Sequence, residues 1–322
     1  MILKTKKKQL DALQTQWGKI KRFGFNWGLI REYFDLNPIT KIQAQLNDRS
    51  VNDLDIHPFF EFLDRTRSAP GQQVLYHNIR QLSPSRVDLD KQENWVQHFT
   101  QKEKARWQSQ LLLGKLADPD DYYFPYMLFG KLPDRPKYYA LFRVLQVLFF
   151  LGLFAAFINR IYVLGLVLIF AINLMLHYRE KAQIGVLSRV FARLGRLNSL
   201  ANKLIPYSPI VKGDEKALRK KMRTIDQVVK KISFLNTDQL QDNEVAAVGW
   251  YALELIKIAT LSEVLTFYQV IDDIARIRPE IETVYLYVAE VDVALSIAAL
   301  RACPTIANLS LSPPASNSKL KS

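Results

Sequence analysis

Two long apolar runs constrain the fold of this chain more than any other feature of its sequence. They are Tyr139–Ile158 and Ile161–Leu176, and only the pair Asn159-Arg160 separates them. As α-helices they would be about 30 Å and about 24 Å long at 1.5 Å per residue, close to the thickness of a bilayer's hydrocarbon core. The pattern predicts a transmembrane helical hairpin.

The few polar side chains within these runs are compatible with a membrane. Arg143 stands within a turn of the first run's start and can reach the interface, while Gln146 and Asn173 can form hydrogen bonds between the helices. The alternative is a hairpin buried inside a large soluble bundle. Both runs are apolar on all sides, whereas a packed soluble helix usually keeps a polar stripe, so the membrane is favoured.

Basic residues flank the hairpin on both sides, whereas Arg160 is the one cation of its turn. The positive-inside rule therefore places both flanks in the cytosol. We expect a protein of the inner (cytoplasmic) membrane with two spans and both termini cytosolic. The flanking cations are Lys131, Arg135, Lys137, Arg179, Lys181, Arg189, Arg193 and Arg196.

The charge composition indicates an anionic partner. The 322 residues include 44 Lys and Arg against 31 Asp and Glu, a formal net charge of +13, which favours nucleic acid or anionic lipid without distinguishing them. A content of 49% hydrophobic and 23% charged residues excludes a disordered chain and fits a globular protein with one membrane element. The single cysteine, Cys303, excludes an internal disulfide and fits a reducing compartment.

The cations concentrate on two segments predicted to be amphipathic. Residues 4–34 are predicted to form a helix or a helix pair, because apolar residues recur at spacings of three and four between lysines, and residues 181–204 repeat this pattern with arginines. The first segment either packs on the body of the protein or presents a phosphate- or headgroup-binding face. The candidate anion contacts are Lys6, Lys7, Lys8, Lys19, Lys21, Arg22, Arg189, Arg193 and Arg196.

A helix, a turn and a second helix are predicted between residues 52 and 82. Pro58 stands near the start of a helix that ends at Leu63, a break covers Thr66–Gly71, and Gln72–Arg80 forms the second helix. The glycine that ends the break is expected to allow the reversal through a positive φ angle. Later helices are predicted over 89–112, 214–234, 243–277 and 280–300, and charges inside 243–277 make it a core helix rather than a span.

The same stretch carries a family resemblance. Residues 60–68 read Phe-Glu-Phe-Leu-Asp-Arg-Thr-Arg-Ser, and they resemble the start of the MutS core domain, where a Leu-Asn/Asp-x-Thr-x-Thr/Ser-x-x-Gly-x-x-x-Leu pattern joins two helices. Tyr285–Ile297 is similar to the segment that closes the lever region of that family before its ATPase domain. The matching positions of the first motif are Leu63, Asp64, Thr66, Gly71 and Leu75.

The resemblance, to the membrane-anchored branch of this DNA mismatch repair family, implies an all-α fold. MutS-core-like helical lever segments would be joined by the transmembrane hairpin, with contact to the DNA backbone. The resemblance also implies ATP and Mg²⁺ as cofactors of full-length members. None of the 12 glycines begins a G-x-x-x-x-G-K-[ST] loop, so we expect no nucleotide site and no cofactor here, and a homodimer or an ATPase-bearing partner chain.

Neither catalysis nor metal binding is expected from the sequence. The four histidines include no i, i+4 pair and have no cysteine partner, which argues against a metal site. No pattern places a nucleophile beside a base, so the chain is not predicted to be an enzyme.

These observations divide the chain into five predicted segments. They are a basic amphipathic segment (1–45), a first MutS-core-like helical segment (46–137), the transmembrane hairpin (138–178), a second helical lever or core segment (179–301) and a disordered tail (302–322). The first functional hypothesis is a MutS-like core that contacts the DNA backbone. The alternative is a membrane-bound helical scaffold whose basic faces bind anionic lipid headgroups.

Overall fold

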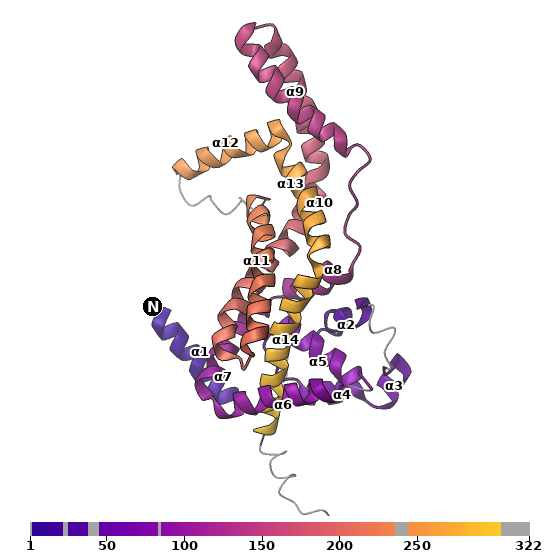
Figure 1. Cartoon of the computed structure of the whole chain (residues 1–322), viewed down its shortest axis with the longest axis vertical. Helices are drawn as coiled ribbons and strands as arrows, with labels where there is room; N and C mark the ends of the chain where they lie inside the picture. Colours follow the sequence, from indigo (N-terminus) through magenta and orange to yellow (C-terminus); the bar gives the residue numbers. More distant parts are fainter. Residues whose placement is uncertain (1, 22–24, 38–44, 83–84, 236–243, 304–322) are drawn as a thin grey trace, which may run out of the picture. The chain divides into compact units, whose positions relative to one another are not determined.

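A computed structural model describes residues 2–21, 25–37, 45–82, 85–235 and 244–303 (Figure 1). Within these ranges the chain is helical and contains no strand, apart from an isolated antiparallel bridge between Gln45 and Gln81, so the all-α prediction is confirmed. The α-helices are α1 Ile2–Gln16, α2 Trp27–Leu36, α3 Asp48–Asp53, α4 Ile56–Leu63, α5 Ala69–Arg80, α6 Arg86–Gln101, α7 Glu103–Leu113, α8 Phe124–Phe129, α9 Tyr139–Ile158, α10 Tyr162–Leu204, α11 Lys212–Leu235, α12 Glu244–Thr260, α13 Ser262–Arg276 and α14 Arg278–Arg301.

The chain forms two compact units, each built from segments that are distant in sequence. Unit 1 comprises Met1–Phe129, Ser199–Arg219 and Glu282–Ser322, and unit 2 comprises Gly130–Asn198 and Lys220–Ile281. The predicted tail from residue 304 onwards lies outside the described residues.

In unit 1, helix α5 forms the centre of the core. It packs against α2, and nearly all of its side chains are buried. Gln73 of α5 links three elements, because its amide nitrogen donates to the carbonyl of Leu29 (2.7 Å) and its amide oxygen accepts from the hydroxyl of Tyr285 on α14 (2.7 Å). The buried amide of Gln73 is therefore hydrogen-bonded at both its nitrogen and its oxygen, as burial requires.

The two helices predicted around residue 66 are present, but the break between them lies at other residues than predicted. Helix α4 ends at Leu63 and α5 begins at Ala69, so Gly71 lies within the first turn of α5. Gly18 is the described glycine that has a positive φ angle, and Gly71 does not. The expected left-handed turn at Gly71 was therefore wrong, and the chain reverses over Asp64–Ser68 instead.

Unit 2 contains the predicted hairpin. Helix α9 has the predicted bounds, but α10 continues for 43 residues without interruption, where the sequence pattern predicts that one helix ends near Leu176 and another begins at Lys181. No glycine, proline or capping residue lies between these two positions, so nothing in the local sequence ends the helix.

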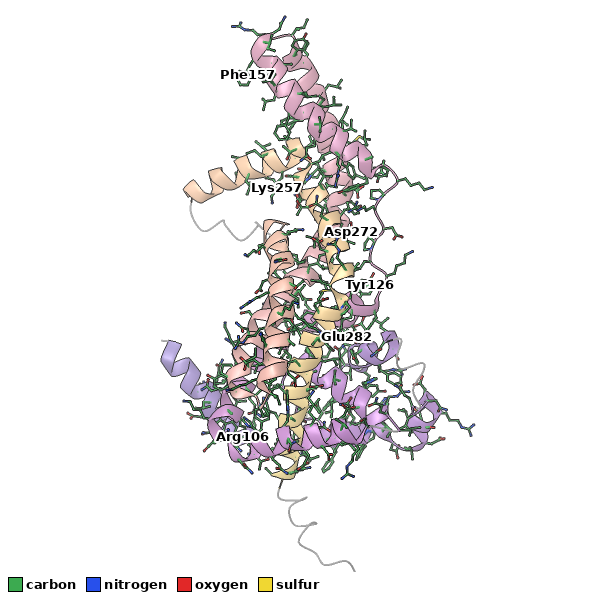
Figure 2. The ribbon with its side chains drawn as sticks, in the orientation of Figure 1. Arg106, Tyr126, Phe157, Lys257, Asp272 and Glu282 are labelled. Atoms are coloured by element: carbon green, nitrogen blue, oxygen red, sulfur yellow. The ribbon has the colours of Figure 1, made fainter. Side chains whose placement is uncertain are left out.

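Three of the described helical segments are long and apolar enough to cross a membrane: Tyr139–Ile158, Tyr162–Lys181 and Arg278–Arg301. The first two are buried over only 11% and 17% of their apolar windows, whereas the third is 72% buried inside the protein. Phe157, which is 84% exposed, projects outwards at the tip of the hairpin (Figure 2). Exposed apolar surface on α9 and α10 is typical of lipid-facing helices, and α14 instead supplies apolar residues to a core.

The segment predicted as one core helix over 243–277 consists of two helices. Leu261, with φ of 50°, separates α12 from α13. Most of α13 is buried, as predicted, but α12 exposes Tyr251, Leu255 and Ile256 and is not a core helix. The predicted helix over 89–112 is likewise divided, into α6 and α7, at Lys102.

Candidate anion-binding surface

Helix α11 carries a stripe of exposed cations. Counted from Lys212, the stripe positions follow at spacings of four, four, three and seven residues, which places them on one face of an α-helix. The α11 stripe consists of the exposed side chains Lys212, Lys216, Lys220, Arg223 and Lys230.

The opposite face of α11 is apolar and buried. This arrangement explains why the segment folds as a helix, because its apolar residues also recur at spacings of three and four and can pack together on one side. Burial of the apolar face fixes the stripe on the outside. The buried residues are Leu218, Met222, Ile225, Val228 and Ile232.

The stripe is not neutralised by neighbouring carboxylates. In the part of the chain that the structure describes, no ion pair joins any of its five cations to an acid. The carboxylate of Glu215 instead bonds Arg219 (2.8 Å), and that of Asp226 accepts from Asn198 (2.7 Å). Five positive charges therefore remain available to an anion in solvent.

Helix α10 supports α11 through a buried polar contact. The side-chain amide of Asn198 donates to the carbonyl of Met222 (3.0 Å) as well as to Asp226, and Gly195 leaves room for Val229. Two predicted anion contacts lie on the same part of α10: Arg193 is half-buried and Arg196 is exposed. The side chain of Arg189, the third, lies outside the described residues.

The N-terminal set of predicted contacts does not share one helix. Helix α1 ends at Gln16, so Lys19 and Lys21 follow it rather than continue its face. Lys8 and Lys19 are exposed, but the ammonium of Lys21 bonds the carboxylate of Asp64 (3.0 Å) and is not available to a phosphate. For Lys6 and Lys7 only the helical backbone is described, and Arg22 lies outside the described residues.

The motif Leu63–Gly71 forms a buried hydrogen-bonded network, and its residues 65–68 also line a cavity of about 500 Å³. Asp64 is fully buried, and its carboxylate accepts from the backbone and hydroxyl of Thr66 and from the amide of Gln72 (2.7 Å) as well as from Lys21. Leu63 ends α4, and Leu75 is buried in α5. These residues hold the reversal of the chain, because the polar groups of a buried loop need partners.

Asp292 of α14 completes this network from a position more than 220 residues away in sequence. Its carboxylate accepts from the hydroxyl (2.6 Å) and the backbone N–H (2.7 Å) of Ser68 and from the backbone N–H of Arg67 (3.0 Å). One turn later, the hydroxyl of Ser296 accepts from the backbone N–H of Arg65 (2.8 Å). Helix α14 therefore supplies hydrogen-bond acceptors to the backbone N–H groups of the loop that joins α4 to α5.

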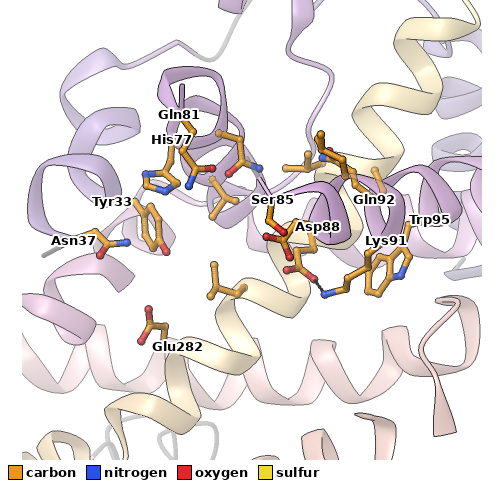
Figure 3. Close-up of a pocket in the computed structure, with 17 residues that line it drawn as sticks. Tyr33, Asn37, His77, Gln81, Ser85, Asp88, Lys91, Gln92, Trp95 and Glu282 are labelled. Atoms are coloured by element: carbon orange, nitrogen blue, oxygen red, sulfur yellow. Dashed lines mark hydrogen bonds and ion pairs between the residues drawn. The ribbon is translucent and has the colours of Figure 1, made fainter. Parts of the chain in front are cut away.

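A cavity of about 510 Å³ in unit 1 is unsuited to a phosphate (Figure 3). Asp88, Glu282 and Glu290 are among its lining residues, and Lys91 is already bonded to Glu290 (2.8 Å). Burial, helped by the charge of Arg80, lowers the pKa of His77 to about 4, so this lining imidazole is neutral at pH 7. The cavity carries an excess of negative charge, and phosphate would be repelled.

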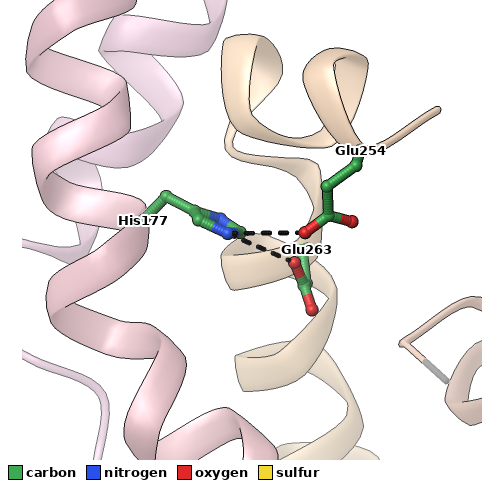
Figure 4. Close-up of side chains that lie close together, drawn as sticks. All are labelled: His177, Glu254 and Glu263. Carbon is green, nitrogen blue, oxygen red and sulfur yellow. Dashed lines mark ion pairs between the residues drawn. The ribbon is translucent and has the colours of Figure 1, made fainter. Parts of the chain in front are cut away.

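One cluster in unit 2 has ligands of the kinds that bind metals. The Nε2 atom of His177 on α10 lies 3.9 Å from Glu254 of α12 and 3.7 Å from Glu263 of α13 (Figure 4). The ammonium groups of Lys181 (2.9 Å) and Lys257 (3.9 Å) also face Glu254, so two cations already surround this carboxylate. We therefore assign an ion-pair cluster that fastens α12 and α13 to α10.

Residues 214–234 were predicted to form a helix, but the cations of this segment were not among the predicted anion contacts. Their spacing, out of phase with the apolar residues of the same segment, was the signal that could have identified the stripe. No family model, curated protein or solved structure matches this chain.

Proposed function

We propose that this chain is a membrane-anchored helical protein that binds the phosphate backbone of duplex DNA through the α11 stripe. The observation that carries the proposal is the row of five exposed cations without carboxylate partners on one helix face. The stripe is about 27 Å long at 1.5 Å per residue, and B-DNA presents one charge per about 1.7 Å of its axis. A rigid helix of this kind can follow a backbone without reading bases.

The position of Lys220, Arg223 and Lys230, the part of the stripe that belongs to unit 2, favours DNA over the protein's own membrane surface. Along α10, Asn198 lies about 25 Å beyond Lys181, the end of the candidate span, and this asparagine contacts the middle of α11. The Debye length at physiological ionic strength is about 8 Å, so headgroup charges act weakly at that distance. Binding of the stripe to anionic headgroups is the competing function.

The resemblance to MutS proteins is a second argument for the proposed function. The two stretches that carry it, around Asp64 and around Asp292, contact each other through the buried network of unit 1. Two matched motifs that meet in space are expected if both belong to one core. We therefore propose a helical body similar to the core and lever of MutS proteins, anchored by α9 and the first half of α10, with both termini cytosolic and with an ATPase supplied by another chain.

Duplex binding by the full chain in a neutral detergent tests this function. If all five stripe cations contact phosphates, log affinity should fall with log salt at a slope of about −4.5. Replacing Lys216, Lys220, Arg223 and Lys230 with Gln should flatten the slope by about 3.6 and leave sequence preference unchanged. Fluorescence anisotropy with a labelled duplex from 50 to 300 mM salt measures both.

A matched variant separates the stripe from net charge. It replaces four exposed lysines elsewhere, Lys102, Lys104, Lys115 and Lys137, with Gln and therefore removes the same charge. This control should keep nearly the full slope. Equal slopes in the two variants, or no duplex binding by the native chain at 50 mM salt, would exclude the proposal. Loss of binding to anionic vesicles in the stripe variant alone, without DNA binding, would establish the lipid function instead.

A further inference from the structure

Helix α12 has its apolar and charged residues on the opposite sides from those of a soluble surface helix. Tyr251, Leu255 and Ile256 are 64%, 56% and 57% exposed, and Ala252 beside them is exposed as well. At positions i, i+1, i+4 and i+5 these four residues share one helix face. No charged residue is found on this face between Tyr251 and Thr260.

The charged residues of this part of α12 point into the protein. Lys257 is 1% exposed, and Glu254 faces His177 and Lys181 of α10 in the ion-pair cluster. A helix in water normally buries its apolar face and exposes its charges. The reversed arrangement is favourable where the surroundings of the helix are less polar than its protein contact.

The end of α12 lies level with a candidate span. The side chain of Asn173 donates to the carbonyl of Ala259 (2.6 Å), and Asn173 precedes Lys181, the last residue of the span, by about 12 Å along α10. Half of a hydrocarbon core is about 15 Å thick, so this contact would lie inside the inner leaflet. Helix α12 also contacts α9 and then runs outwards from the base of the hairpin (Figure 1).

We propose that α12 lies in the cytosolic leaflet of the membrane, with Tyr251, Ala252, Leu255 and Ile256 in contact with lipid. The inference rests on the membrane insertion of α9 and α10 in the proposed function, and it adds a third, non-spanning membrane contact. A second copy of the chain is the rival occupant of this face. Lipid is favoured because α12 contacts α9, whose exposed side chains are themselves apolar. Interfacial helices use apolar faces of this kind, with an aromatic residue near the headgroups.

Spin-label accessibility in the full-length chain tests the proposal. In a Cys303→Ser background, single cysteines replace Leu255 as the test, Leu168 as the hairpin control and Lys102 as the solvent control. Each protein is labelled with a nitroxide and reconstituted into phosphatidylcholine vesicles. Leu168 and Lys102 are both exposed, so the controls differ from the test site in surroundings rather than in burial.

A lipid-facing label collides with dissolved oxygen more often than with a polar nickel chelate. We expect this pattern at positions 168 and 255 and the reverse at position 102. A water-like result at 255 with a lipid-like result at 168 would overturn the lipid contact of α12 and leave the hairpin intact. Water-like results at both would remove the membrane insertion on which it rests. Low access to both reagents at 255, with dipolar broadening between labels, would place a second copy on this face and would also overturn the proposal.

Discussion

Gly71 illustrates how one side chain can be excluded by a distant one. A Cβ atom at this position would lie 2.2 Å from Oδ2 and 2.6 Å from Cβ of Asp292. The Asp292 carboxylate cannot move away, because Ser68 and Arg67 hold it with hydrogen bonds. Glycine is required here by the close approach of α14 to α5, and not by the dihedral angles of a turn.

Gly71→Ala should therefore destabilise unit 1 by about 2 kcal/mol or more, since overpacking of a fixed core costs about 1–3 kcal/mol and the carboxylate also loses donors. Thermal unfolding of the full chain in detergent, followed by far-ultraviolet circular dichroism, measures this loss. Gly114→Ala is the matched control, because no atom lies within 4 Å of its added Cβ, and its midpoint should stay close to that of the native chain. Equal midpoints for the two variants would contradict the close approach.

Single residues also show what the sequence could not reveal. Asp64, Thr66 and Ser68 are turn residues between two apolar helices, so the existence of a break was predicted, but it covers Asp64–Ser68 rather than Thr66–Gly71. Asp292 was noted as part of a second motif, but its pairing with Ser68 depends on tertiary packing across more than 220 residues. A local sequence pattern does not show which residues far apart in the sequence come into contact.

Among the helices, the elements with strong periodicity were predicted best. The bounds of α9 agree with the prediction, and α11 and α14 each begin and end within two residues of it. The continuity of α10 was missed because the pattern changes from apolar to amphipathic at Lys181, which resembles a helix boundary. No residue there ends the helix. The division between α12 and α13 depends on Leu261, a residue type that does not signal a left-handed conformation.

The pairing of α10 with α11 predicts a measurable local effect. Asn198 is 3% exposed and bonds both Met222 and Asp226, so Asn198→Ala leaves a buried carbonyl without this donor. We expect a cost of about 1–3 kcal/mol and faster hydrogen exchange of the amides of α11. Asn202→Ala on the same helix removes only an exposed contact to Arg219 and should leave α11 protected. Unchanged exchange in Asn198→Ala would show that the α10 contact does not stabilise α11.

At the scale of the whole chain, neither unit could be predicted from the sequence, because neither corresponds to one continuous stretch of residues. Each is assembled from segments before and after the hairpin, and the predicted segments 46–137 and 179–301 were based on continuous stretches. Composition indicates an anionic partner only as a class, because net charge does not say which cations remain unpaired. Lys21 and Arg219, for example, are both bonded to carboxylates.

The number of helices that cross the membrane decides the topology of the whole chain. This number depends on whether α14 is a span. If α9 and the first half of α10 alone cross the membrane, residues on both sides of the hairpin share the cytosol, as the positive-inside rule predicts. If α14 also crossed, the chain end would lie on the other side. The burial of α14 inside the protein, at 72% of its apolar window, argues for two spans.

Fusions of a phosphatase that is active only outside the cytosol distinguish these topologies. We expect activity when the enzyme is inserted between Asn159 and Arg160, and no activity when it follows Ser208 or Ser322. Inactivity after Ser208 together with activity after Ser322 would establish α14 as a third span and contradict its assignment to a core. Activity at Ser208 would mean that the α9 and α10 pair does not return the chain to the cytosol, which would remove the α11 stripe from contact with DNA and leave the proposed function without a substrate.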